Sequence, residues 1–132
     1  MKNISHKIIF EGNNHNQLRF HEINAIMLLM NYFNSNIICV RTASCKTPDL
    51  KIKNVEWELK SPIGNGPNTI EKILKKATKQ SKNIVLDFSR IKMDEKRAID
   101  RLKFYLCNNK HSIRRLLVIT KRHKIVDFMD LI

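Results

Sequence analysis

Residues 47–62 of the chain read Thr-Pro-Asp-Leu-Lys-Ile-Lys-Asn-Val-Glu-Trp-Glu-Leu-Lys-Ser-Pro. Apolar and polar residues alternate on both sides of Lys53-Asn54, which is the pattern of two half-buried strands joined by a tight turn. Counting outward from that turn places Asp49 opposite Glu58. We therefore predict an antiparallel hairpin whose apolar face consists of Leu50, Ile52, Val55, Trp57 and Leu59.

The other face of this hairpin carries Asp49, Glu58 and Lys60. Side chains directly opposite each other in such a pair have Cβ atoms about 4.5–5.5 Å apart, and two carboxylates at that distance repel. A divalent cation between them would remove the repulsion. Lys60 could hold a phosphate, or orient a water molecule that attacks it. Mg²⁺ is bound through few protein carboxylates, leaving room for water and phosphate oxygens. We predict that Asp49 and Glu58 are ligands of Mg²⁺, with Mn²⁺ or Zn²⁺ as alternatives, and that the Leu59 carbonyl could add another oxygen.

The composition indicates one folded, basic domain. The chain has 132 residues, 42% of them hydrophobic, with only three Gly and three Pro, which argues against disorder. Its formal net charge of +13 favours a polyanionic partner. Most of the excess lies in residues 67–132, which hold 17 Lys and Arg against 7 Asp and Glu. The alternative explanation is a solubilising surface.

Cysteines and apolar runs limit the other classes. The three cysteines have no metal-knuckle or redox spacing, and the context of Cys39 and Cys107 predicts small core residues. The five histidines lie at no ligand spacing. No apolar run is long enough to span a membrane, and no signal peptide follows Lys2.

Three helices are expected, over residues 17–33, 69–81 and 94–108. Glu22 falls within the apolar stripe of the first helix, where it could either reach water from the edge of the stripe or point at the hairpin acids as a further metal ligand. Asn68 and Glu71 have capping-box spacing for the second helix, and Asp94 can cap the third. Cationic side chains opposite the apolar stripes are predicted to contact nucleic-acid phosphates: Lys72, Lys75, Lys76, Lys79, Arg97 and Arg101.

Further strands are expected at residues 37–40, 84–88 and 113–120, with short ones at 8–10 and 124–129. The order from residue 17 is then α-β-β-β-α-β, followed by another helix and strands. We predict a single α/β domain over residues 17–132, a mixed β-sheet flanked by helices, preceded by a polar segment at 1–16. Gly64-Asn65-Gly66 lacks the spacing and ending of a Walker phosphate loop.

The motif Pro48-Asp49, followed by Glu58-Leu59-Lys60, resembles the signature of PD-(D/E)XK nucleases, whose core is α-β-β-β-α-β. The resemblance adds Glu22 on the first helix and Gln80 on the helix after the motif as catalytic residues beside Asp49, Glu58 and Lys60. Over residues 17–128 the chain is also similar to C-terminal toxin domains of bacterial contact-dependent growth inhibition proteins with this fold. That similarity is carried by Thr47-Pro48-Asp49, Trp57 to Pro62, Thr69-Ile70 and Ala77 to Ser81.

The resemblance implies a metal-dependent endonuclease toxin that hydrolyses phosphodiester bonds, in tRNA by preference and otherwise in DNA. It implies export as the end of a larger cell-surface protein and action in the cytoplasm of a neighbouring bacterium. It also implies a cognate immunity protein, and we expect a monomer when that partner is not bound.

The residues alone leave two other functions open. A basic module could bind nucleic acid through its Lys and Arg helices without cutting it. A ribonuclease could use histidine as general acid and base without a metal. The opposed acids of the hairpin favour the metal-dependent nuclease, because a simple binder has no need for carboxylates on the face that meets phosphates.

Overall fold

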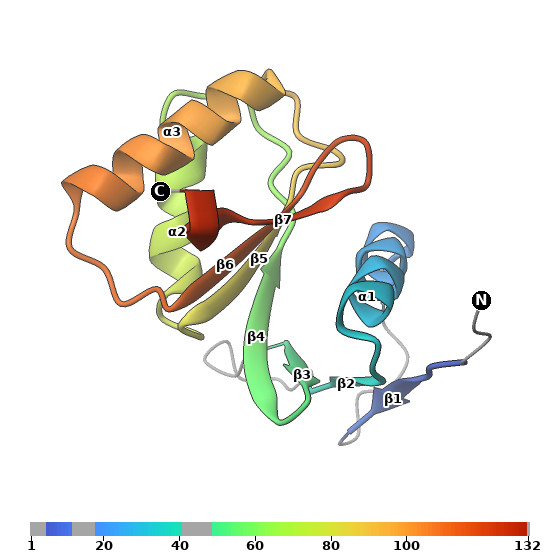
Figure 1. Cartoon of the computed structure of the whole chain (residues 1–132). Coiled ribbons are helices and arrows are strands. Elements are labelled where there is room, and N and C mark those ends of the chain that lie inside the picture. Colours follow the sequence, from blue (N-terminus) through green and yellow to red (C-terminus); the bar gives the residue numbers. More distant parts are fainter. Residues whose placement is uncertain (1–4, 12–17, 41–48, 132) are drawn as a thin grey trace.

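The computed structural model describes residues 5–11, 18–40 and 49–131 (Figure 1). In this part of the chain, seven strands form one mixed sheet in the order β1 to β7, together with three α-helices. The predicted single α/β domain with a mixed sheet is confirmed. The strands are β1 (Ile8–Phe10), β2 (Ile37–Cys39), β3 (Leu50–Ile52), β4 (Val55–Lys60), β5 (Asn83–Asp87), β6 (Arg115–Ile119) and β7 (Ile125–Asp127). The helices are α1 (Phe20–Phe33), α2 (Thr69–Ala77) and α3 (Glu95–Asn108), and a short 3-10 helix, η1 (Phe128–Leu131), follows β7.

The sheet contains both parallel and antiparallel pairs. β1 is parallel to β2, the β2–β3–β4 meander is antiparallel, β4, β5 and β6 are parallel, and β7 returns antiparallel to β6. Each parallel step from β4 to β6 needs a crossover, and α2 and α3 supply it. The element order predicted from the sequence, α-β-β-β-α-β, is the observed order α1-β2-β3-β4-α2-β5.

The β3–β4 hairpin has the predicted register. Ile52 pairs with Val55 and Leu50 with Trp57. Lys53 and Asn54 form the turn with φ of 50° and 68°. Two central residues with positive φ define a type I′ turn, whose twist matches that of the flanking strands. Of the predicted apolar face, Val55 alone is exposed, at 38%, because it adjoins the turn.

Helices cover the sheet on both faces, α1 on one side and α2 and α3 on the other (Figure 1). Alternation along the inner strands divides the core accordingly: Val85 packs in the α1 cluster, whereas Ile84 and Leu86 pack in the α2–α3 cluster. On β4, Trp57 and Leu59 belong to the α1 cluster. Residues that alternate with them must point the other way, so Glu58 and Lys60 lie on the α2–α3 face of the sheet.

The helix starts differ in part from the sequence prediction. α1 begins at Phe20, and the Glu22 carboxylate accepts a hydrogen bond of 2.9 Å from the Arg19 amide at the helix start. α2 begins at Thr69 as expected, but the Asn68 side chain makes no capping hydrogen bond, so the predicted capping box is wrong. The predicted Asp94 cap of α3 is confirmed, since its carboxylate accepts from the Arg97 amide.

The two described cysteines differ in burial. Cys39 is buried in β2, as predicted, but Cys107 is exposed, and its assignment to the core was wrong. The inward stripe of α3 passes through Leu102, Tyr105 and Leu106, and one further helical step turns Cys107 toward solvent. In the described residues, no helix has the length and apolar composition to cross a membrane.

The turn of the hairpin gives a test of the fold. Lys53 adopts a left-handed conformation that Asn tolerates better than Lys. We expect Lys53→Asn to raise the free energy of unfolding by about 0.5–1 kcal/mol in urea denaturation. The matched control, Lys110→Asn, changes an exposed position outside the positive-φ residues and should leave stability unchanged. A loss of stability in Lys53→Asn would contradict the assigned turn.

Candidate active site

Asp49 and Glu58 meet on the α2–α3 face of the hairpin. Asp49 directly precedes β3, one position beyond the Leu50–Trp57 pair, and Glu58 lies in the middle of β4. The Asp49 carboxylate accepts a hydrogen bond of 3.3 Å from the Leu59 amide. The opposition of acids predicted from the pairing is therefore present. Pro48, the first residue of the motif, lies outside the described residues.

Glu58 is the unusual member of the pair, because its side chain is only 1% exposed. Its Oε2 atom lies 3.1 Å from the Lys60 ammonium. Its Oε1 atom is buried without a hydrogen-bond partner. A buried acceptor without a partner costs free energy, and at functional sites it often faces a ligand.

The surroundings of Glu58 raise its pKa to about 7. Burial is the largest cause, because desolvation disfavours the charged form, and the nearby Asp49 charge adds to it. The Lys60 ammonium lowers the pKa but does not offset these two effects. Near neutral pH, the ionisation of both carboxyl groups at once is therefore unfavourable.

The donor atoms fit a hard divalent cation. The Asp49 carboxylate and the unpartnered Glu58 Oε1 are oxygens of the kind that Mg²⁺ and Mn²⁺ prefer. The described residues contain no group of three or more His, Cys, Asp and Glu that could hold a metal. The protein would therefore supply two carboxylates, and water and phosphate oxygens would complete the coordination. The pair contains no Cys or His, which makes Zn²⁺ the poorer match.

Glu22 and Gln80 differ in their positions relative to Asp49 and Glu58. The structure does not gather Glu22 with Asp49 and Glu58 into a three-ligand group, and a role for Glu22 through water stays a prediction. Gln80 ends the turn that follows α2. The next side chain, that of Ser81, donates to the Glu56 carbonyl of β4 at 3.0 Å, so Gln80 leads the chain back to the strand that carries Glu58. A catalytic role for Gln80 also stays a prediction.

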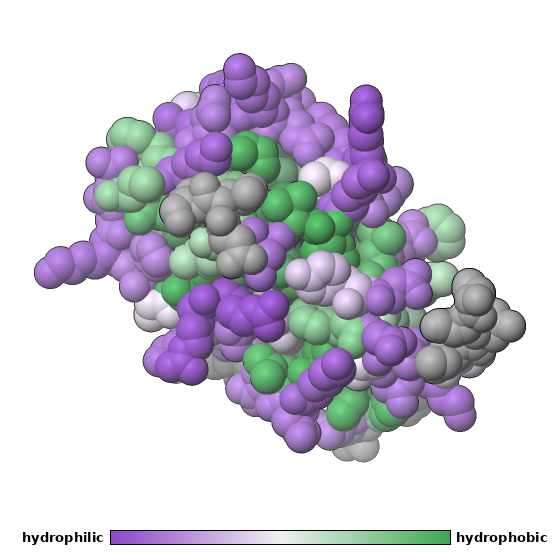
Figure 2. Space-filling view, in the orientation of Figure 1, coloured by the Kyte–Doolittle hydropathy of each residue, from purple (hydrophilic) through white to green (hydrophobic). Residues whose placement is uncertain are grey.

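The predicted cationic face is exposed along α2. Lys72, Lys75 and Lys76 lie on the helix and Lys79 in the turn after it. Figure 2 shows many hydrophilic side chains along the outer edge of the molecule on the α3 side. Arg97 on α3 is also exposed. These five side chains are available to phosphates, and their contact with nucleic acid stays a prediction.

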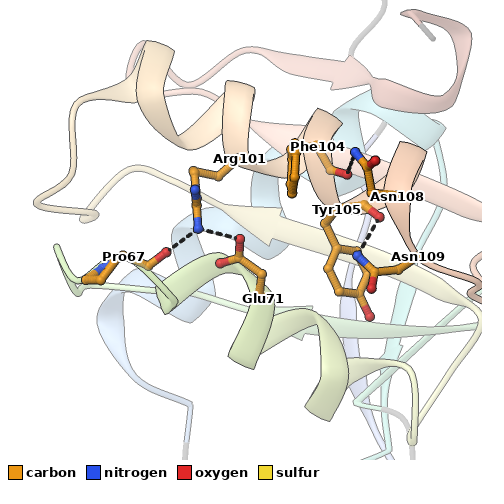
Figure 3. A network of polar contacts seen from close by, with 7 residues as sticks. All are labelled: Pro67, Glu71, Arg101, Phe104, Tyr105, Asn108 and Asn109. Atoms are coloured by element: carbon orange, nitrogen blue, oxygen red, sulfur yellow. Dashed lines mark hydrogen bonds and ion pairs between the residues drawn. The ribbon is translucent and has the colours of Figure 1, made fainter.

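Arg101 has a structural role that the sequence did not reveal. It pairs with Glu71 at 2.8 Å and donates to the Pro67 carbonyl at 2.7 Å, which joins α3 to the start of α2 (Figure 3). Glu71 is engaged here instead of in the expected capping box. The two residues lie on different helices, so no local spacing could have indicated the pair. Phosphate binding by Arg101 stays a prediction.

Comparison with protein families matches residues 46–125 to the contact-dependent growth inhibition CdiA C-terminal domain. The chain belongs to this family, and it is accordingly a growth-inhibition toxin domain that acts on a neighbouring cell.

Among solved structures, the chain is similar to a chain of the CdiA-CT/CdiI toxin and immunity complex from Burkholderia pseudomallei. The match has a TM-score of 0.61 and 14% sequence identity, and it covers 91% of this chain and 96% of the other. At this identity the likeness concerns the fold. No curated protein matches the sequence.

The raised pKa of Glu58 gives a test in the metal-free protein. A carboxyl whose pKa rises from 4.5 to about 7 on folding binds more protons in the folded state between these values, so stability falls as pH rises through them. We expect Glu58→Gln to remove this fall, which amounts to about 3 kcal/mol at most. Urea denaturation from pH 4.5 to 8 measures it.

The control is Glu56→Gln, which removes an exposed carboxylate from the same strand. Its pH dependence should follow the wild type. If Glu58→Gln also follows the wild type, the raised pKa of Glu58 is wrong. If the variant unfolds at all pH values, the ionised carboxylate beside Lys60 is required for the fold.

Proposed function

We propose that the chain is a metal-dependent endonuclease toxin of the PD-(D/E)XK type. The observation that carries the proposal is the buried Glu58, with one oxygen unpartnered, Asp49 beside it and the Lys60 ammonium 3.1 Å away. A structural ion pair does not need a second acid, and a solvent-exposed binding face does not need a buried one. The element order α1-β2-β3-β4-α2-β5 supports the proposal, because it is the order of that nuclease core.

Asp49, Glu58 and Lys60 have different roles in the proposed hydrolysis. Asp49 and Glu58 would hold Mg²⁺, and the bound cation would supply positive charge near the phosphate and lower the pKa of a water. Glu58 must be ionised for this role, so protons compete with the cation below pH 7. Lys60, at the accessible end of the same strand face, donates to a phosphate oxygen or orients the attacking water. Because Lys60 lies against Glu58, a cation held by Glu58 and the Lys60 ammonium would be within reach of one phosphate.

The substrate we propose is nucleic acid, tRNA in the first place and DNA in the second. The exposed lysines of α2 supply sequence-independent affinity for the phosphate backbone. The net charge of +13 is consistent with either polymer. The resemblance to toxin nucleases of both kinds leaves tRNA only slightly preferred over DNA.

We further propose a cognate immunity protein as partner. The similar Burkholderia pseudomallei structure is a complex of a toxin with its immunity protein. By the same relationship, we propose that the domain is exported as the end of a larger cell-surface protein and acts in the cytoplasm of the target cell. Without its immunity protein we expect it to be a monomer.

Metal removal tests the reaction directly. We expect the domain to cut total tRNA or plasmid DNA with Mg²⁺ and to lose this activity in EDTA. Without a cation, the two negative carboxylates would repel the phosphate. Glu58→Gln and Asp49→Asn should lower cleavage by a factor of at least about 10² while leaving tRNA affinity nearly unchanged. The control Asp100→Asn removes an exposed carboxylate of α3 and should cut normally.

Two outcomes would overturn the proposal. Cleavage that persists in EDTA would favour the metal-independent ribonuclease. Survival of both substrates in Mg²⁺, Mn²⁺ and Zn²⁺ would favour the non-catalytic binding module.

The α2 face gives a separate prediction about binding. Replacing Lys72, Lys75, Lys76 and Lys79 together by Gln should weaken tRNA binding and reduce the slope of log affinity against log salt. The reduction should be about 0.7–0.9 for each phosphate that the protein no longer neutralises. The control replaces four exposed lysines elsewhere, Lys96, Lys103, Lys110 and Lys124, and makes the same change in net charge. An equal slope in both variants would exclude a specific role for this face.

A further inference from the structure

A cleft of about 610 Å³ lies at the turn end of the β3–β4 hairpin. The hairpin supplies one wall and the segment that enters β5 supplies the other; the lining residues are Lys51, Asn54, Val55 and Glu56, and Ser81, Lys82 and Asn83. This volume is within the range of small-ligand sites. The cleft contains none of the acids of the candidate active site.

The strand register places this cleft beside the active site. Lys51 pairs with Glu56 across the hairpin, and this pair is one step from Asp49 and Glu58 on the same face. Two residues along a strand span about 6.6–6.8 Å. That is close to the separation of successive phosphates along an extended nucleic-acid strand. A polynucleotide whose scissile phosphate sits at Asp49 and Glu58 would therefore bring its next nucleotide to the cleft.

Hydrogen bonds fix the wall opposite the hairpin. Ser81 Oγ and Asn83 Nδ2 both donate to the Glu56 carbonyl, at 3.0 and 3.1 Å, and the Asn83 amide donates to Ser81 Oγ at 3.1 Å. These contacts hold the segment that carries Lys82 against β4. The cleft is therefore preformed, and binding would order few side chains apart from the two lysines.

The charges in the cleft favour a nucleotide over a bare anion. Lys51 and Lys82 provide two positive charges, and Glu56 provides one negative charge and two acceptor oxygens. The lysines suit a phosphate, while the carboxylate suits a hydroxyl or amino donor on the same ligand. Lys51 also approaches Glu11 at 3.9 Å, but this ion pair is long and partly exposed, so it is weak enough to give way to a phosphate.

We propose that this cleft binds the nucleotide next to the scissile phosphate, with the phosphate of that nucleotide on Lys51 and Lys82. The inference rests on the proposed nuclease function and adds to it a subsite on the turn side of the metal-binding acids. Lys51 and Lys82 are positioning residues here, because they hold the strand in register without touching the reacting atoms. Loss of this subsite should raise KM more than it lowers kcat.

The first experiment uses binding alone, without metal and without cleavage. The full chain is titrated with AMP, adenosine and inorganic phosphate, and the backbone amide resonances are followed by NMR. AMP should shift the resonances of Lys51, Asn54, Ser81 and Asn83 more than adenosine or phosphate does at equal concentration. Lys51→Gln/Lys82→Gln should abolish the shifts, and the equally charged control Lys103→Gln/Lys124→Gln should retain them.

Absence of shifts in the cleft, or equal shifts in the Lys51→Gln/Lys82→Gln protein, would overturn the subsite. If that double variant failed to fold, Lys82→Gln alone would serve, because Lys82 is exposed. This result does not depend on nuclease activity, so it separates failure of the subsite from failure of the proposed function.

The second experiment uses cleavage of a short RNA that the wild type cuts in Mg²⁺. The KM of the double variant should be on the order of tenfold higher than that of the wild type, because a charged hydrogen bond to the substrate is removed. Its kcat should stay within about twofold of the wild-type value. Replacing the phosphate beside the cut by a neutral methylphosphonate should raise KM for the wild type by the same factor and leave the double variant unchanged. Cutting with an unaltered KM in the double variant would overturn the subsite and leave the nuclease assignment intact.

Discussion

The burial of one carboxylate, that of Glu58, sets the conditions for the rest of the site. Its side chain is 1% exposed on the inner strand β4, where the neighbouring residue of β5 is the apolar Ile84. An apolar side chain at this place would extend the α2–α3 core and would need neither Lys60 nor a raised pKa. The chain instead keeps an acid whose desolvation is only partly offset. Departures from local packing rules of this kind concentrate at functional sites.

Strand β4 can carry this acid because its two faces have different surroundings. Trp57 and Leu59 fix the strand to the α1 cluster, and Trp57 is among the largest fully buried side chains. The opposite face is then free to hold Glu58 and Lys60 without weakening that anchor. The tight turn at Lys53-Asn54 sets the register of β3, and the register brings Asp49 to Glu58. Positioning of the acids thus depends on backbone pairing more than on side-chain packing around them.

Features governed by the two-residue period were predictable from the sequence. The hairpin, its register and the opposition of Asp49 and Glu58 follow from alternation alone, because a slip of one residue would expose Trp57 and bury Lys51. The inner strands β5 and β6 were evident as apolar runs, since helices cover both of their faces. Features that depend on distant partners were not predictable. The spacing of Asn68 and Glu71 suits a capping box, but Arg101 from α3 pairs with Glu71 instead. Lys51 belongs to a cleft only because the α2–β5 segment folds opposite the hairpin. A local sequence pattern identifies the buried and exposed faces of a helix or strand. The residues that contact each face are set by the tertiary fold.

In the proposed function, the same carboxylate would link folding to cation binding. With a pKa of about 7, Glu58 can be neutral in the cation-free domain, and the protein folds without holding two adjacent negative charges. In the proposed function, a divalent cation that binds the ionised pair would displace this proton and could use the unpartnered Oε1 atom, while Lys60 stays on Oε2. Its binding free energy is therefore reduced by the work of ionising Glu58, most strongly below pH 7. At neutral pH that work is small, because about half of the molecules are already ionised at a pH equal to the pKa. If the proposed cation binds, a buried acid with a pKa near neutrality would thus be neutral in the cation-free folded domain and ionised in the cation-bound one.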